Sequence, residues 1–258
     1  MRTLWGPRNR RTAARGWTGA AGLLVGAALL AYALHRDRRW GVTSLLLCAA
    51  VTAPVLAYNV LAFGSLQGGY AWLNATHRSF HGVDGPWSTS LGEGLLGLLL
   101  SPSRGLFVYS PVLVFAIVGL ALSRNDRRRR LFGFLAVALG ASIVMLASWS
   151  VWWGGHSYGP RLLTDFLPVL TLFLVPVWNR LDRSRPLRVG FLALLIASLW
   201  IQAIGAFYYP SPRDRDWNKT PRDVDFAHER LWDWRDPQIV RLLANGPHPV
   251  WRPSSGAR

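Results

Sequence analysis

The sequence predicts an all-α protein, a polytopic transmembrane helical bundle of five to six spans, and three observations support this fold class. About half of the residues are apolar. They are concentrated in blocks long enough to cross a bilayer, with little charge inside each block. The arginines cluster in the short segments between blocks, which is the pattern of basic loops in multi-pass membrane proteins. We therefore expect an inner- or plasma-membrane protein that crosses the bilayer several times.

The net charge bears on which partners the protein binds, and the cysteine content bears on disulfide bonds. The formal net charge is +16, and Lys219 is the only lysine. A strongly basic balance is also typical of nucleic-acid binding, but here the arginines lie in inter-helix loops rather than along one soluble face. We therefore expect membrane lipids, and no nucleic acid, as partners. Cys48 is the single cysteine and lies in an apolar run, so the chain has no disulfide framework.

The chain divides into three regions. Residues 1–16 form a basic N-terminal arm, residues 17–209 form the transmembrane domain, and residues 210–258 form a polar tail. The expected spans are residues 17–34, 40–63, 106–122, 131–151, 162–178 and 189–209. Residues 91–100 are apolar but too short to cross, so we expect a short interfacial or re-entrant helix with Glu93 in its first turn.

Loop charge predicts the orientation. The loops at 35–39, 124–130 and 179–188 are rich in arginine and should face the cytoplasm. Because successive spans cross the bilayer in opposite directions, residues 64–105, residues 152–161 and the tail are then expected on the extracytoplasmic side. The same alternation places the N-terminal arm outside although the arm is itself basic, a conflict that the sequence leaves open.

The tail contains about half of the acidic residues and four tryptophans. Residues 231–240 could form a tryptophan-rich amphipathic element on the membrane surface. The alternative is a partly disordered tail with a few aromatic anchors.

Two polar junctions stand out between the apolar blocks. The first junction, residues 101–111, contains Arg104 in a Ser-Pro-Ser-Arg-Gly turn, and the second, residues 148–168, contains Arg161 after Gly-Pro. A cation beside the hydrocarbon phase is costly unless it is paired, hydrated or bound to a ligand. Two arginines on one face, with one at a helix N-terminus, favour binding of a lipid phosphate. The alternative is that they contact lipid headgroups or hold helices together.

Asp165 lies four residues after Arg161, where an α-helix would allow an ion pair. We therefore expect Asp165 to orient Arg161 rather than to act as a base.

Other residues of the two junctions are candidates to line a pocket. They are Ser101, Tyr109, Trp152, Trp153, His156 and Tyr158. The aromatic rings could bind a sugar or an isoprenoid chain, although interfacial aromatic belts need no ligand. We expect no resident cofactor and no metal site, while a role for a divalent cation stays open. His77 and His81 have i, i+4 spacing but lack the glutamate that a zinc protease places after the first histidine.

Several of these motifs together resemble a known family. They are Phe63-Gly64-Ser65 with Gly69-Tyr70, residues 101–111, residues 152–161 with Asp165 and Pro168, and Trp232-Asp233-Trp234. As a set they are similar to bacterial polyprenyl-phosphate-dependent glycosyltransferases of the GT-C class, in the group of protein mannosyltransferases and aminoarabinose transferases. The resemblance covers about residues 40 to 245.

The resemblance implies transfer of a sugar from a polyprenyl-phosphate-linked donor on the extracytoplasmic side. Arg104 and Arg161 would then stabilise the leaving phosphate as its negative charge develops. Such enzymes carry an acidic residue, the presumed base, in the first extracytoplasmic loop of an N-terminal helical half. The only acid of this chain before Asp84 is Asp37, in a loop that we expect to be cytoplasmic.

The sequence is therefore expected to correspond to the donor-binding, C-terminal half of such an enzyme, lacking the N-terminal acid. It would be active only when completed by an N-terminal half or partner subunit. The rival interpretation is a noncatalytic membrane partner or scaffold whose arginines only anchor helices.

Overall fold

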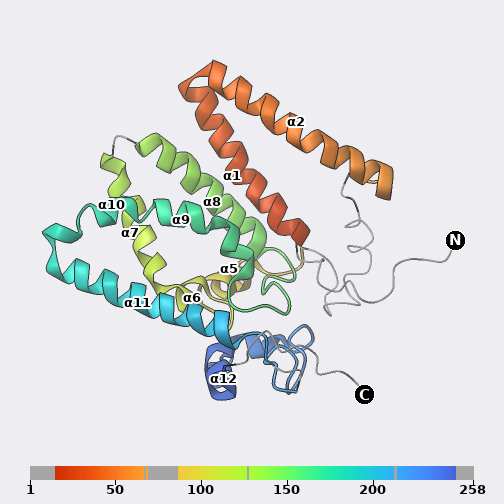
Figure 1. Ribbon diagram of the computed structural model, residues 1–258, viewed down its shortest axis with the longest axis vertical. Helices are drawn as coiled ribbons and strands as arrows, with labels where there is room; N and C mark the ends of the chain where they lie inside the picture. Colours follow the sequence, from red (N-terminus) through yellow and green to blue (C-terminus); the bar gives the residue numbers. More distant parts are fainter. Residues whose placement is uncertain (1–14, 67, 69–86, 127, 212–213, 248–258) are drawn as a thin grey trace.

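The computed structural model describes residues 15–66, 68, 87–126, 128–211 and 214–247, and its described side chains begin at Leu23 (Figure 1). Every regular element in these ranges is helical, which confirms the all-α class. Tyr70, His77, His81 and Asp84 lie outside the described residues.

Four helical segments are long and apolar enough to cross a membrane: Arg38–Phe63, Arg129–Ala147, Arg161–Arg183 and Arg185–Tyr208. They correspond to α2 (Arg38–Phe63), α8 (Arg129–Ala147), the composite run from Arg161 to Arg183, and α11 (Arg185–Tyr208). The chain thus has the make-up of a multi-pass membrane protein. The first expected span is α1 (Arg15–Arg36), of which the apolar part with described side chains, Leu23–Arg36, is shorter than the others.

The third expected span, residues 106–122, is not one helix. It is divided into α6 (Leu106–Tyr109), the 3₁₀ turn η1 (Pro111–Leu113) and α7 (Val114–Leu122). Pro111 lacks an N–H group and disfavours helical geometry in the residue before it, and Ser110 accordingly has φ −142° and ψ 66°.

Side chains of α11 satisfy the backbone groups that this break leaves free. The N–H of Val112 donates to Ser198 Oγ at 3.0 Å, and Gln202 Nε2 donates to the carbonyl of Tyr109 at 3.1 Å. The segment expected to be the third span is thus broken, and the break has polar partners inside the bundle.

The short helix α5 (Leu91–Leu100) has the bounds expected for the interfacial helix. Ser90 caps its N-terminus by accepting from the N–H of Glu93 at 3.4 Å, as N-cap serines do. A Cβ placed on Gly94 would lie 1.8 Å from the carbonyl oxygen of Ala147. Glycine thus lets α5 pack directly against the end of α8.

The composite run from Arg161 to Arg183 is segmented because it contains two prolines. It comprises the 3₁₀ helix η3 (Arg161–Phe166), α9 (Leu167–Leu172), α10 (Val175–Trp178) and the 3₁₀ turn η4 (Leu181–Arg183). Phe166, Phe173 and Val177 are buried along it, in the core that it shares with α7 and α8. α1 packs on α8, whereas α2 has α1 as its main neighbour and projects from the bundle with its apolar surface exposed (Figure 1).

The loops expected to be cytoplasmic gather at one end of the bundle. Arg130 Nη1 lies 3.2 Å from His35 Nε2, which joins the start of α8 to the α1–α2 turn. Asp126 and Arg180, from the other two basic loops, line one shallow hollow. We call this the basic end.

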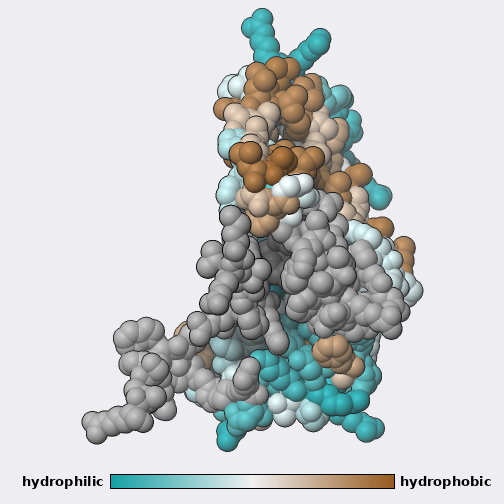
Figure 2. Space-filling view, turned by 90° about the vertical axis from the view of Figure 1, so that its right-hand side faces the viewer, coloured by the Kyte–Doolittle hydropathy of each residue, from teal (hydrophilic) through white to brown (hydrophobic). Residues whose placement is uncertain are grey.

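The opposite end carries both junctions and the tail. Here residues 214–247, which we call the cap, pack against the junctions through the 3₁₀ helix η5 (His228–Trp232) and α12 (Gln238–Asn245) (Figure 1). In Figure 2 apolar residues dominate the upper part of the visible face, and hydrophilic residues gather at the lower end.

The cap is a folded unit. Trp217, Val224 and Leu231 are 1%, 0% and 0% exposed. Residues 231–240 are therefore part of a folded unit, with Leu231 and Gln238 buried, rather than a disordered tail. Their expected position on the membrane surface stays a prediction.

Candidate functional site

The two junctions that the sequence singled out lie against each other. Tyr109 of the first junction contacts Tyr158 of the second edge to face, with ring centroids 5.0 Å apart. Gly159 has φ +62°, and a Cβ at this position would lie 2.6 Å from the Tyr109 ring. A glycine is therefore required both for the backbone conformation and for the close approach of the two segments.

Arg104 is the centre of this contact. It is 1% exposed, and its guanidinium donates five hydrogen bonds. The acceptors are Ser103 O (2.7 Å), Trp153 O (2.9 Å), Gly155 O (3.2 Å), Asn218 Oδ1 (2.7 Å) and Gln238 Oε1 (2.8 Å). A guanidinium has five N–H donors, so all of them are used, and burial lowers the pKa of Arg104.

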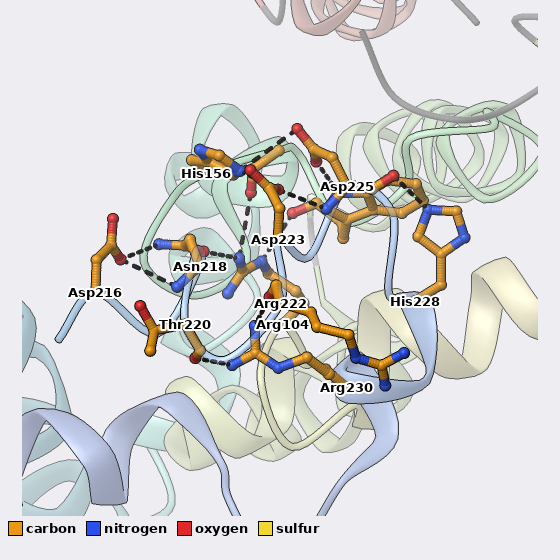
Figure 3. Close-up of polar contacts among 12 residues, drawn as sticks. Arg104, His156, Asp216, Asn218, Thr220, Arg222, Asp223, Asp225, His228 and Arg230 are labelled. Carbon is orange, nitrogen blue, oxygen red and sulfur yellow. Dashed lines mark hydrogen bonds and ion pairs between the residues drawn. The ribbon is translucent and has the colours of Figure 1, made fainter. Parts of the chain in front are cut away.

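Polar residues of the cap, among them Asn218, lie beside Arg104 in Figure 3, and the ring of Trp217 completes its surroundings. The guanidinium carbons of Arg104 and Arg230 lie 5.3 and 4.6 Å from the ring centroid of Trp217, within cation–π range. Arg104 therefore joins both junctions to the cap. In this arrangement it has no donor left for a lipid phosphate.

Gln238, the first residue of α12, is a second point of attachment between cap and junctions. It is fully buried, and its Oε1 also accepts from Tyr109 OH at 3.3 Å and from the N–H of Gly159 at 3.4 Å. Its Nε2 donates to the carbonyl of Ser157 at 2.9 Å. Donor and acceptor atoms of one amide thus hold three segments together.

The expected pocket-lining residues are all found at this end, mostly as buried packing. Ser101 is buried and donates to Leu231 O at 2.6 Å, and Trp152 and Trp153 are 2% and 3% exposed. Tyr158 donates to Ile201 O at 2.6 Å, and burial raises the pKa of its hydroxyl. As packed here, the two tryptophans leave almost no ring surface for a sugar.

Arg161 differs from Arg104. It is partly exposed, and its guanidinium forms no hydrogen bond or ion pair within the described part of the chain. The expected pair with Asp165 is absent because residues 161–166 form a 3₁₀ helix rather than an α-helix. With three residues per turn, positions i and i+4 no longer share a face. Asp165 is exposed and does not orient Arg161 in this structure.

His156 lies beside two cap carboxylates (Figure 3). Its Nε2 is 2.7 Å from Asp223 Oδ1 and 3.5 Å from Asp225 Oδ2. Asp225 Oδ1 accepts from Trp153 Nε1 at 2.8 Å. The second junction is thus linked to the cap by an imidazole and an indole, each facing carboxylate oxygens.

Sequence reasoning missed the cap's contribution: Trp217, Asn218, Asp223, Asp225 and Gln238. The concentration of acidic residues in the tail was a signal that the tail packs against basic or polar residues elsewhere in the chain. The particular partners could not be found because these cap residues lie 67 to 134 residues away in the chain from the junction residues that they contact.

Comparison with known proteins identifies no family. No family model matches the chain, and no solved structure matches it. One curated protein, rat myotubularin-related protein 12, is similar at 29% identity over 109 residues. The match covers 36% of this chain and 15% of that protein, so the chain spans only a small part of the relative's length.

Proposed function

We propose that this protein is the lipid-donor half of a membrane glycosyltransferase, which binds a polyprenyl-phosphate-linked sugar at its cap end. The supporting observation is that both junctions of the motif set converge at one end of a bundle of spanning-length helices. The enzyme class itself rests on the resemblance of those motifs. Sugar transfer would require an acid from an N-terminal half or partner subunit.

The geometry changes the roles proposed for the two arginines. Arg161 is the phosphate ligand in this proposal, because its guanidinium is partly exposed and has no partner in the described part of the chain. Arg104 is a positioning residue, since its five donors hold the second junction and cap in place. Pairing of Arg161 with a lipid phosphate is a charge-assisted contact of the kind that arginine favours.

Lipid binding by the detergent-solubilised full chain tests this proposal. Undecaprenyl phosphate is compared with undecaprenol, which has the same chain without the phosphate. We expect the wild type to prefer the phosphate lipid and Arg161→Gln to lose about tenfold in affinity for it, since a hydrogen bond to a charged group contributes about 1.5–3 kcal/mol. Arg180→Gln, at the basic end, is the matched control and should bind as the wild type does.

Two results would contradict the proposal. One is equal binding of both lipids by the wild type. The other is an unchanged preference for the phosphate lipid in Arg161→Gln.

A second function, a noncatalytic membrane partner or scaffold, is favoured by the environment of Arg104. A buried arginine whose donors all go to protein acceptors is what a purely structural junction would contain. This alternative predicts that the wild type is stably folded in detergent yet shows no preference for the phosphate lipid.

A further inference from the structure

We propose that His156, Asp223 and Asp225 form a binding site for a first-row divalent cation, which clamps the cap onto the second junction. The proposal does not depend on the glycosyltransferase assignment. It rests on three side chains from two segments that are 67 residues apart in the chain. One ligand atom of each lies within 4.8 Å of the others.

The spacing of the three ligand atoms fits one coordination sphere. Metal–ligand bonds of about 2.1 Å place neighbouring donor atoms roughly 3.0–3.4 Å apart in octahedral or tetrahedral geometry. The imidazole nitrogen lies 2.7 Å and 3.5 Å from the two carboxylate oxygens, on either side of that range. The two carboxylate oxygens lie within 4.8 Å of each other, and binding of one ion would draw the three atoms into this range.

The surroundings orient the ligand atoms. Trp153 Nε1 holds Asp225 Oδ1, so that Asp225 Oδ2 faces His156. The His228 ring packs on Trp153 at 4.4 Å between centroids and contacts the carbonyl of Asp225 at 3.0 Å. Hydrogen-bonded outer partners of this kind fix ligand orientation in metal sites.

The exposure of the site also favours a cation. Two carboxylates face a single imidazole. The guanidinium groups of Arg104 and Arg230 interact electrostatically with Asp225 and Asp223, respectively, and Arg222 pairs with Glu229. Among the described residues, Asp223 has only His156 as an ion-pair partner. The His156 and Asp223 side chains are 31% and 38% exposed, which leaves an entry path and room for water ligands.

The donor set indicates the class of metal. One imidazole nitrogen and two carboxylate oxygens suit zinc and manganese, with water in the open positions, better than a soft ion that requires thiolates. Zinc is the appropriate first probe because it binds N/O sites more tightly than manganese does.

Zinc binding by the full chain in detergent tests the site. After treatment with EDTA and removal of the chelator, the protein is titrated with Zn²⁺, and bound zinc per chain is measured by elemental mass spectrometry. We expect about one equivalent in the wild type. His156→Gln and Asp223→Asn should each weaken binding at least tenfold, because each removes or neutralises one ligand.

Matched controls separate this site from unspecific surface binding. His35→Gln at the basic end and Asp214→Asn on the cap surface should retain one equivalent. Zinc should also slow tryptic cleavage within the cap of the wild type, and this protection should be absent in Asp223→Asn. The proposal is overturned if the wild type retains no zinc, or if both His156→Gln and Asp223→Asn bind it as tightly as the wild type.

Discussion

At the scale of single residues, the contrast between the two junction arginines is the main finding. Both were singled out because a guanidinium at the edge of a membrane is costly without a partner. The guanidinium of Arg104 donates hydrogen bonds to acceptors in both junctions and in the cap, which offset this cost. Arg161 does not, since the 3₁₀ turn moves Asp165 away from it.

Replacement of Arg104 should release the cap. Arg104→Met removes the donor of five acceptors, of which Gln238 Oε1 and Gly155 O keep other donors. The carbonyls of Ser103 and Trp153 and Asn218 Oδ1 lose theirs, and each buried group left unsatisfied costs about 1–3 kcal/mol. We expect the free energy of unfolding to fall by about 3 kcal/mol or more, measured by denaturant titration in detergent, and tryptic cleavage after Arg230 to accelerate. Arg188→Met removes an exposed arginine and should change stability by about 0.5 kcal/mol or less. Equal losses in the two variants would show that Arg104 does not hold the cap.

At the scale of elements, glycines allow the close packing that brings the first junction to its place. Within α5, a Cβ on Gly97 would lie 2.4 Å from the Trp152 ring, whereas a Cβ on Gly92 would have no neighbour within 4 Å. The bounds of α5 were predictable because Ser90, Glu93 and an apolar run are local signals. The break at Pro111 was not predicted, and the polar partners that satisfy it, Ser198 and Gln202, belong to another helix.

A pair of alanine substitutions on α5 tests this packing. Gly97→Ala should destabilise the protein by about 1–3 kcal/mol, because the added methyl group overlaps a buried indole. Gly92→Ala should be neutral or stabilise the protein by up to about 1 kcal/mol, since alanine is the better helix former. Denaturation midpoints of the two variants in one detergent give the comparison. A neutral Gly97→Ala would mean that Trp152 does not pack on α5 as described.

At the scale of the whole molecule, the chain has two chemically different ends. The three basic loops meet at one end, and both junctions and the cap meet at the other. Figure 1 shows α1 beginning at its end away from the α1–α2 turn, on the side of the bundle where the cap lies. Loop charge predicts that the basic end faces the cytoplasm.

Cysteine labelling tests this orientation. In a Cys48→Ser background, Asp233→Cys places a thiol on the exposed surface of the cap and Asp182→Cys places one at the basic end. A membrane-impermeant maleimide should label the cap variant in intact cells and the other variant only after permeabilisation. The reverse pattern would mean that the orientation is inverted, and labelling of both in intact cells would contradict a transmembrane arrangement.

Sequence alone determined the class of the protein and its layout along the chain. Apolar run length, loop arginines and local capping signals are read within a few tens of residues, so the helical class, α5 and the grouping of the basic loops were predictable. Only the tertiary structure decided what the polar residues do. The partners of Arg104, His156 and Gln238 come from distant segments. Tertiary packing brings these segments within hydrogen-bond distance of one another. A buried polar group must find a partner, but only the folded chain determines which one it finds.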